Sequence, residues 1–231
     1  MYIKNLFDTL RETPDENNVI SEMLESQEET GLSDFDLVVI IGSLYGAGVD
    51  TTRSQLGLIF DYFLSNPGSY KEFADRYWKK VDNEVDASKT LATMIREISR
   101  VNPTIRGSVR YASEDIEYRN VKFPKGTFLF LGYASANMDK SIRERAEFVD
   151  FELAEMQHYQ DLTFGAGAHR CPGTSLAMVQ AVSLLRTFVH TFSNMERNGE
   201  PTYRESSASV FGPNSLPVKL TRREKAESTH S

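Results

Sequence analysis

The single cysteine of the chain, Cys171, lies in the glycine-rich stretch Phe-Gly-Ala-Gly-Ala-His-Arg-Cys-Pro-Gly, which covers residues 164–173. A cysteine thiolate acts as a nucleophile or binds a soft metal ion. The stretch runs directly into a long apolar segment predicted to be helical, and the dipole and free N–H groups at a helix N-terminus stabilise a negative charge. The alternative is a small buried hydrophobic side chain, the commoner fate of a free cysteine.

The residues around this cysteine indicate the kind of ligand that the loop accepts. Gly165, Gly167 and Gly173 allow tight turns and a close approach to a flat ligand that a Cβ atom would hold off. Phe164 offers a ring, and His169 offers a hydrogen bond to an anionic edge. The stretch therefore predicts a binding loop for a flat ligand with an anionic edge.

A second group of chemically active side chains, Asp50 and Thr51, lies inside a long apolar segment. Gly46 and Gly48 weaken a helix there and remove side-chain bulk, so the acid and the hydroxyl mark a break in an apolar wall. Such groups can hold and transfer protons. The alternative is a helix that uses glycine for close packing and satisfies its polar groups internally.

Phe164, Gly167, Cys171 and Gly173, with His169 between them, resemble the haem-binding loop of the cytochrome P450 monooxygenases. In that family a cysteine thiolate holds the haem iron. The resemblance implies haem b (iron protoporphyrin IX) as the cofactor and Cys171 as the metal ligand. The further cofactor-binding residues that it implies are His169, Arg110, Phe164, Gly165, Gly173 and Ala47.

The resemblance extends to other motifs in the order in which the family carries them. Asp50 and Thr51 fall on the acid and alcohol positions of the oxygen-activating helix, which implies catalytic roles in proton delivery. Glu97 and Arg100 match the structural Glu-x-x-Arg pair, and Arg110 matches an arginine that reaches a haem propionate. Without this context, Glu-x-x-Arg is a weak signal and Arg110 an ordinary exposed strand residue.

One segment departs from the family pattern. The family has a proline- and arginine-bearing turn whose arginine completes a triad with the Glu-Arg pair, but Glu147 stands at the arginine position here. Phe148 holds the aromatic place of that turn. Either Arg143 or Arg145 substitutes from a shifted register, or the triad is incomplete.

The fold class expected from these patterns is mainly α with small β hairpins. It corresponds to the C-terminal half of the cytochrome P450 fold, with a long central helix, a Glu-x-x-Arg helix, the cysteine haem loop and a proximal helix. Apolar spacing predicts buried character for Leu37 to Val49 and for the helix after the cysteine loop. The predicted helices cover residues 3–12, 18–27, 33–64, 69–80, 89–101 and 174–195. The predicted β segments are a strand, turn and strand over 121–128 and a terminal hairpin over 208–220.

The composition is that of an ordinary soluble globular protein of 231 residues, with 40% hydrophobic and 26% charged residues. A formal net charge of −7 argues against a nucleic-acid binder. The apolar run Leu37 to Val49 is too short to cross a bilayer. We find no Walker loop, dinucleotide fingerprint or zinc-spaced cysteine and histidine set. His158, His190 and His230 are scattered, and we expect them to be structural or exposed.

The resemblance covers only about half of a haem-thiolate monooxygenase. We expect residues 1–231 to form a single partial domain that lacks the family's N-terminal helices, and residues 222–231 to be a frayed charged tail. Two functions stay open. The chain is a monooxygenase that hydroxylates a small hydrophobic substrate, or it is a truncated remnant or fragment that binds haem weakly and acts, if at all, as an interaction module.

The resemblance also implies partners and a location. The expected partners are a small hydrophobic substrate, O₂ and an electron donor of the ferredoxin or flavodoxin type that docks near Arg170. No nucleic acid and no membrane segment are expected, and the expected location is the cytoplasm. With half of the covering helices missing, we expect the chain alone to be marginally stable, to associate, and to hold haem loosely without measurable monooxygenase turnover.

Overall fold

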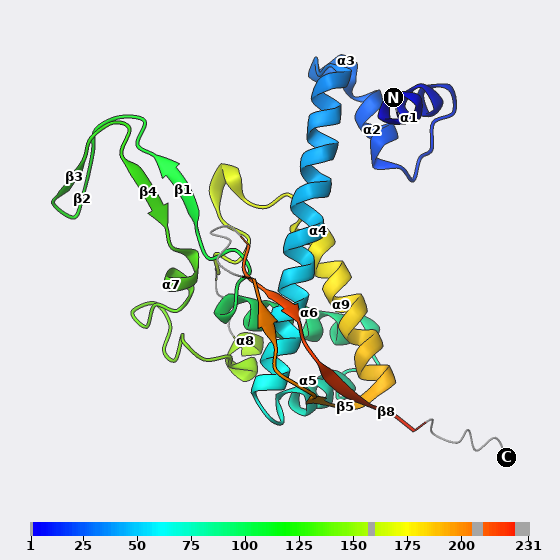
Figure 1. The fold of residues 1–231 in the computed structure, drawn as a ribbon, viewed down its shortest axis with the longest axis vertical. Coiled ribbons are helices and arrows are strands. Elements are labelled where there is room, and N and C mark those ends of the chain that lie inside the picture. The colour runs from blue at the N-terminus through cyan, green and yellow to red at the C-terminus, as the bar shows by residue number, and fades with distance from the viewer. Residues whose placement is uncertain (1, 157–159, 205–209, 225–231) are drawn as a thin grey trace. The chain divides into compact units, whose positions relative to one another are not determined.

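The computed structural model describes residues 2–156, 160–204 and 210–224. The chain divides into two compact units, Met1–Val49 and Asp50–Ser231. Helices dominate both units, and the strands form small two-stranded antiparallel sheets (Figure 1). The predicted class, mainly α with small β hairpins, is confirmed.

In the first unit, three short helices pack against the start of a long one. These are α1 (Tyr2–Glu12), α2 (Val19–Glu25), α3 (Gln27–Thr30) and the beginning of α4 (Asp34–Ser65). Their buried core consists of Phe7, Leu10, Leu24 and Leu37. The helix α4 begins with a reciprocal cap, because Ser33 Oγ accepts the Asp36 N–H while the Asp36 carboxylate accepts the Ser33 N–H.

The prediction that Leu37 to Val49 is a buried core segment is wrong. Leu37 is buried, but every residue from Gly42 to Val49 is exposed, and Phe35 and Tyr45 each keep 74% of their surface. The apolar residues encircle the helix while the unit's core contacts one side of its first turns, so the remainder faces outward. In the described part of the chain, α4 alone is long and apolar enough to span a membrane, a test that core helices of soluble proteins also pass.

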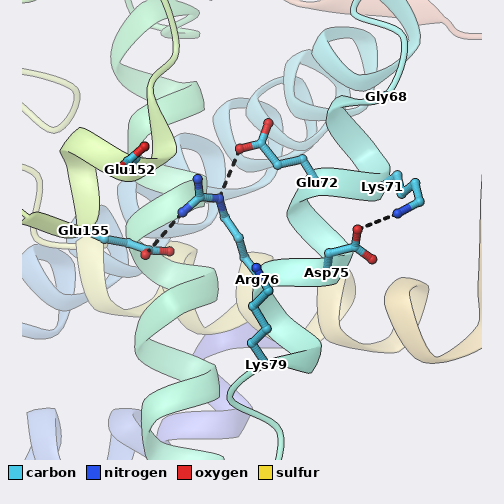
Figure 2. Close-up of a pocket in the computed structure, with 8 residues that line it drawn as sticks. All are labelled: Gly68, Lys71, Glu72, Asp75, Arg76, Lys79, Glu152 and Glu155. Carbon is cyan, nitrogen blue, oxygen red and sulfur yellow. Dashed lines mark hydrogen bonds and ion pairs between the residues drawn. The ribbon is translucent and has the colours of Figure 1, made fainter.

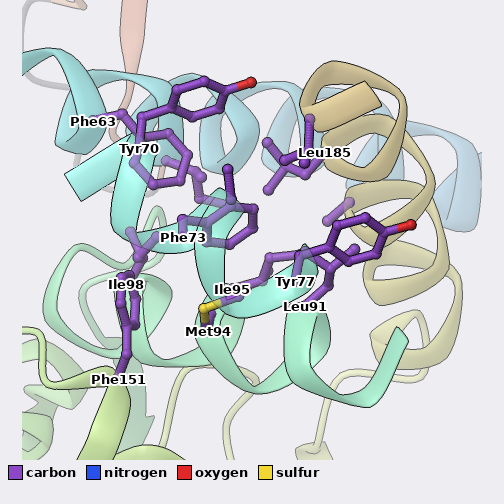
Figure 3. Close-up of a cluster of buried hydrophobic side chains, with 14 of the residues drawn as sticks. Phe63, Tyr70, Phe73, Tyr77, Leu91, Met94, Ile95, Ile98, Phe151 and Leu185 are labelled. Atoms are coloured by element: carbon purple, nitrogen blue, oxygen red, sulfur yellow. The ribbon is translucent and has the colours of Figure 1, made fainter. Parts of the chain in front are cut away.

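The second unit has one large core built from several helices. The helix α6 (Glu84–Val101) packs against α5 (Ser69–Trp78), α8 (Phe151–Met156) and α9 (Thr174–Thr191). Figure 3 shows how rings from α4 and α5 meet aliphatic side chains of α6 and α9. The labelled core residues are Phe63, Tyr70, Phe73, Tyr77, Leu91, Met94, Ile95, Ile98, Phe151 and Leu185.

The strands pair differently from the predicted hairpins. Two strands occur where a strand, turn and strand was expected at 121–128, but they do not pair with each other. The first, β3 (Val121–Phe123), pairs with β2 (Ile116–Tyr118). The second, β4 (Phe128–Leu131), pairs with β1 (Ser108–Tyr111). The terminal segment likewise supplies partners for earlier strands, not for itself. There β7 (Pro213–Ser215) pairs with β6 (Thr202–Tyr203), and β8 (Val218–Arg222) pairs with β5 (Phe192–Arg197).

Three helix predictions need correction. The helix α6 begins at Glu84, not Lys89, because Asn83 accepts hydrogen bonds from the N–H groups of Val85 and Asp86 and so caps it earlier. The helix α9 ends at Thr191, since the next residues pair as β5. The expected burial of α9 holds only from Ala181 onward, at Ala181, Leu185 and Val189, whereas Leu176 and Val179 are exposed.

A close approach between α4 and the turn before β7 depends on two glycines. A Cβ atom on Gly57 would lie 2.6 Å from Cγ of Pro213, and one on Gly212 would lie 2.6 Å from Cβ of Ser54. Both distances are shorter than carbon atoms tolerate, so these positions accept only glycine without movement.

We expect Gly57→Ala to lower the free energy of unfolding by about 1–3 kcal/mol, the usual cost of overpacking a rigid contact. Gly42→Ala on the same helix is the matched control, because a Cβ atom there meets nothing within 4 Å. It should stabilise the protein by about 0.5–1 kcal/mol through helix propensity. Urea unfolding of both variants measures the difference, and effects of the same sign would contradict the proposed contact.

Candidate functional site

The cysteine loop closes on itself and leaves Cys171 exposed. The Cys171 N–H donates to the carbonyl oxygen of Phe164 at 2.9 Å, across a short 3-10 turn, η1 (Gly167–His169). Gly165 and Gly167 have φ angles of 68° and 67°, in the left-handed region that favours glycine. The predicted tight turns are therefore present, and the loop holds its cysteine accessible to a ligand.

The loop connects directly to the start of α9. Gly173 is the N-cap residue of this helix, and Thr174 Oγ1 donates to the carbonyl oxygen of Cys171 at 2.8 Å. A Cβ atom on Gly173 would lie 3.7 Å from the sulfur, so the glycine keeps one side of the thiol open. His169 and Arg170 are exposed beside it, and Phe164 is half-buried.

Arg110 is linked to the neighbourhood of the cysteine loop through two hydroxyl groups. Its Nη1 donates to Ser108 Oγ at 3.1 Å, and Ser108 Oγ lies 2.6 Å from the Tyr133 hydroxyl. The Tyr133 ring and hydroxyl in turn lie 3.9 Å from the position of a Cβ atom on Gly165. Sequence reasoning missed Ser108 and Tyr133, which no motif marks, yet they connect Arg110 to the loop.

The Glu97–Arg100 pair is buried and bidentate. Arg100 Nε and Nη2 each donate to the Glu97 carboxylate at 2.9 Å, and both side chains keep less than 5% of their surface. Arg100 also donates to the carbonyl oxygens of Asn137, Ala146 and Phe148. The guanidinium therefore ties α6 to the chain around α7 (Tyr133–Asn137) and to the turn before α8.

Arg143 supplies the third member of this group, which resolves the alternative that the sequence left open. Its Nη1 and Nη2 donate to the two Glu97 oxygens, each at 2.9 Å, from a buried position. Arg145 lies outside the group, because its side chain is exposed and pairs with Asp150 at 3.6 Å. Glu147 instead pairs with Lys140.

The environment of Glu97 keeps it ionised. Burial disfavours its charged form, but hydrogen bonds from Arg100, the Asp150 N–H and Arg143 outweigh burial and lower the pKa of Glu97 below its ordinary value. One carboxylate thus accepts five hydrogen bonds from three residues, Arg100, Arg143 and Asp150.

Asp50 on α4 is engaged by an arginine from far along the chain. Arg204 Nη1 and Nη2 donate to its two oxygens at 2.5 Å each, and Arg53 lies 3.5 Å away. The Arg204 guanidinium lowers the pKa of Asp50 below its usual range. The neighbouring Thr51 is half-buried, and Ala47 on the same helix is exposed. Sequence reasoning missed Arg204, since it belongs to no local motif.

A surface pocket elsewhere in the second unit contains none of the predicted site residues. Its volume is about 600 Å³, and charged side chains of α5 and α8 line it (Figure 2). Arg76 bridges the two helices by donating to Glu72 and Glu155. Because Lys71 and Arg76 are already paired with carboxylates of the pocket, it has the character of a solvated salt-bridge network.

The remaining predictions concern the other histidines and the C-terminal tail. His190 Nε2 lies 2.7 Å from the Tyr77 hydroxyl, which is consistent with a structural role. His158, His230 and residues 225–231 of the predicted tail lie outside the described residues, and Arg222 ends β8. No group of three or more potential metal ligands occurs in the described ranges.

Comparison with known proteins decides the family. The family model described as Cytochrome P450 matches residues 1–221. The chain belongs to the cytochrome P450 family. The resemblance carried by the cysteine loop is thereby confirmed, and membership of this family implies a haem iron cofactor.

Several curated P450 enzymes are similar to this chain. Luteothin monooxygenase of Streptomyces thioluteus is 25% identical over 88% of the chain and 47% of its own length. Epothilone C/D epoxidase of Sorangium cellulosum is 28% identical over 87% of the chain and 45% of its own length. The chain thus spans about half the length of the curated relatives it matches.

Solved P450 structures have the same fold over the matched region. CYP109E1 from Bacillus megaterium, in complex with corticosterone, superposes with a TM-score of 0.82 at 21% identity, over 96% of this chain and 56% of that one. Ligand-free CYP164A2 from Mycobacterium smegmatis gives a TM-score of 0.78 at 25% identity, over 94% and 52%. The P450 fold predicted from the sequence is therefore confirmed for about half of a P450 chain.

The residues of the cysteine loop fit a haem. The loop offers one accessible thiol, and the described ranges contain no group of three or more potential metal ligands, which suits a macrocycle that supplies the other donors. Gly173 leaves space at the sulfur that a larger residue would narrow. Tyr133 lies beside Gly165 of the loop, and Ser108 links Arg110 to Tyr133.

Proposed function

We propose that the chain is the haem-thiolate part of a monooxygenase that hydroxylates a small hydrophobic substrate with O₂ and electrons from a redox partner. The observation that carries this proposal is the exposed Cys171 in its closed glycine loop at the start of α9. Haem bound to a thiolate supplies the oxygen-activating redox chemistry. The rest of the proposal assigns roles to side chains of this chain.

Each predicted site residue has a defined task. Cys171 holds haem b through its sulfur, while Gly165, Gly173 and Phe164 shape the loop. His169 and Arg110 hold the anionic edge of the haem, and Ala47 leaves room at the central helix. These roles draw support from the loop geometry and from the donors around Gly165.

Asp50 and Thr51 handle protons in this proposal. The Asp50 carboxyl takes a proton from solvent at Oδ, and the Thr51 hydroxyl passes a proton on at Oγ1. Their neighbouring positions on α4 and their partial exposure support this route.

Thr51→Ala should divert reducing equivalents to hydrogen peroxide, and Asp50→Asn should slow turnover by roughly 100-fold or more, because each variant removes a proton-transferring group. The measurement is the ratio of product and peroxide formed to reductant consumed, in a catalytically competent full-length form loaded with haem. Thr187→Ala is the matched control, since Thr187 is an exposed threonine on α9. Unchanged coupling and rate in both site variants would remove the assigned roles.

The relatives and the surface around the cysteine loop support the proposed substrate, electron donor and location. Relatives named for epothilone C/D epoxidation and polyketide biosynthesis support an organic substrate. Exposed Arg170 beside the cysteine supports docking of an acidic donor of the ferredoxin or flavodoxin type. The bacterial relatives favour a soluble, cytoplasmic protein.

The exposed apolar side of α4 favours a second candidate, an interaction module that binds haem weakly or not at all. Phe35, Val39 and Tyr45 leave a large apolar area in water, which is typical of a surface that another chain covers. Haem titration distinguishes the candidates: stoichiometric, tight binding supports the enzyme, and weak binding supports the module.

A further inference from the structure

The carboxylate of Asp161 lies three residues ahead of Phe164, where the cysteine loop begins, and it is almost buried. Its side chain keeps 7% of its surface, and Arg96 of α6 donates from Nη2 to its Oδ2 at 2.8 Å. Its other oxygen, Oδ1, accepts the N–H of Thr163 at 2.9 Å. The carboxylate therefore ties α6 to the turn that leads into the loop.

A second link between α6 and the same turn runs through Asn137, a buried residue at the end of α7. Asn137 Oδ1 accepts the N–H of Leu162 at 2.7 Å, and its backbone carbonyl oxygen accepts Nη1 of Arg100 at 2.6 Å. Arg96 and Arg100 are four residues apart on α6 and so share one face of that helix. Two arginines of one helix face thus hold consecutive residues of the turn, Arg96 through Asp161 and Arg100 through Asn137.

Backbone hydrogen bonds connect the turn to Cys171. The Leu162 carbonyl oxygen accepts the N–H of Gly165 at 3.0 Å, and the Phe164 carbonyl oxygen accepts the N–H of Cys171 at 2.9 Å. Phe164 follows Thr163 directly, so it lies between the residues that α6 holds and the bond that fixes the cysteine. Displacement of Thr163 must therefore move the acceptor of the Cys171 N–H.

The exposure of the two partners indicates what the loss of Arg96 would do. Arg96 keeps 42% of its side-chain surface, so its removal opens no cavity in the core. It leaves a nearly buried carboxylate without the cation that neutralises it, and an unpaired charge at low exposure moves toward water. That movement breaks the bond from the Thr163 N–H. An exposed ion pair differs, because water replaces a lost partner there at little cost.

We propose that Arg96 is a positioning residue for the haem ligand: through Asp161 it fixes the turn before Phe164, and so the placement of Cys171. The inference rests on the proposed function, since this placement serves catalysis only if Cys171 binds haem. It gives Arg96 a task separate from that of its neighbour Glu97, whose carboxylate holds two buried arginines.

Hydrogen exchange of backbone amides tests the held turn in the haem-free chain of 231 residues. Arg96→Gln should accelerate exchange at Thr163 and Cys171 about 5- to 30-fold, because the carboxylate then releases the turn. Leu185 is fully buried in α9, so its amide reports global unfolding and should change far less. Equal acceleration at all three amides would mean that Arg96 stabilises the whole fold without positioning the turn, and would overturn the proposal.

Arg186→Gln is the matched control. Arg186 keeps 44% of its side-chain surface and pairs with Glu84 at 2.7 Å, so it resembles Arg96 in exposure and contact length but does not bind the turn. The substitution should leave exchange at Thr163 and Cys171 unchanged. Acceleration there equal to that in Arg96→Gln would show that any lost arginine has this effect, which contradicts the assignment.

A second pair of variants tests whether charge acts through Asp161. Arg96→Lys keeps a cation, and since a single nitrogen of Arg96 donates to the carboxylate, it should restore most of the protection. Asp161→Asn keeps an oxygen for the Thr163 N–H and needs no cation. The double variant Arg96→Gln with Asp161→Asn should therefore exchange no faster than Arg96→Gln alone. Additive acceleration would show that the two residues act independently and would refute the mechanism.

The consequence for the haem ligand is measured by transfer of haem from the reconstituted chain to excess apomyoglobin. Arg96→Gln should lose haem about 5- to 30-fold faster while keeping the thiolate-type carbon monoxide band, and Arg186→Gln should behave as wild type. Faster amide exchange with unchanged haem loss would show that the turn does not position the ligand. If Cys171→Ala keeps a thiolate-type band, the proposed function fails by itself, and the exchange results still decide whether Arg96 holds the turn.

Discussion

Replacement of Cys171 by alanine is expected to abolish thiolate-type haem binding by this chain. Cys171 is the single cysteine of the chain and is exposed, and the described ranges contain no group of three or more other potential metal ligands. A haem that still associates would have to use a nitrogen or oxygen donor or water. Such a ligand does not donate electron density as a thiolate does.

The measurement is the reduced carbon monoxide spectrum of the chain after haem reconstitution. Wild type should show the thiolate-type band, and Cys171→Ala should lack it at every haem concentration. His169→Ala is the matched control from the same loop: it removes a hydrogen-bond donor, keeps the sulfur, and should retain the band with about 10- to 100-fold weaker haem affinity. A thiolate-type band that persists in Cys171→Ala would refute the assignment.

The second large effect is expected at Arg143. Its removal deprives the buried Glu97 carboxylate of two hydrogen bonds and half of its positive partners. Breaking a buried ion pair by removing one partner costs about 3–5 kcal/mol, because the other charge stays uncompensated. We therefore expect Arg143→Ala to lower the free energy of unfolding by that amount.

Arg145→Ala is the matched control for this experiment. Arg145 lies two residues away with a mainly exposed side chain, and its contact with Asp150 is 3.6 Å long. Its loss should change stability by no more than about 0.5 kcal/mol. Urea unfolding of the two variants at neutral pH provides the comparison. Equal losses would mean that the Glu97 group does not depend on Arg143.

The buried Glu97 group makes the free energy of unfolding depend on pH. The folded pKa of Glu97 lies below the ordinary value of 4.5, because three sets of hydrogen bonds favour its charged form. A lowered folded pKa contributes stability that is complete above the unfolded pKa and is lost as the pH falls through the folded pKa. Urea midpoints measured from neutral to acid pH should fall in wild type below the ordinary glutamate pKa. That fall should be smaller in Glu97→Gln, which has no charge to lose.

Local patterns in the sequence were sufficient to predict the turns of the cysteine loop and the contact between Glu97 and Arg100. Glycines at Gly165 and Gly167 specify left-handed turns wherever the loop is placed, since only glycine enters that region without cost. Residues three apart on a helix share a face, so the contact between Glu97 and Arg100 follows from α6 alone. Both features depend on neighbours in the chain and are therefore readable from it.

Contacts between distant segments were decided by the tertiary structure. Arg143, and not Arg145, reaches Glu97 because of the path of the turn between them. In that turn Arg145 itself has a φ angle of 55°, which no spacing rule specifies. The pairing of β3 with β2 instead of β4 depends on which strand edges meet. The exposure of Tyr45 depends on which elements cover α4. Arg204 reaches Asp50 across 154 positions because the chain after β6 folds back onto the helix, and hydrophobic periodicity carries no information about a contact of that range.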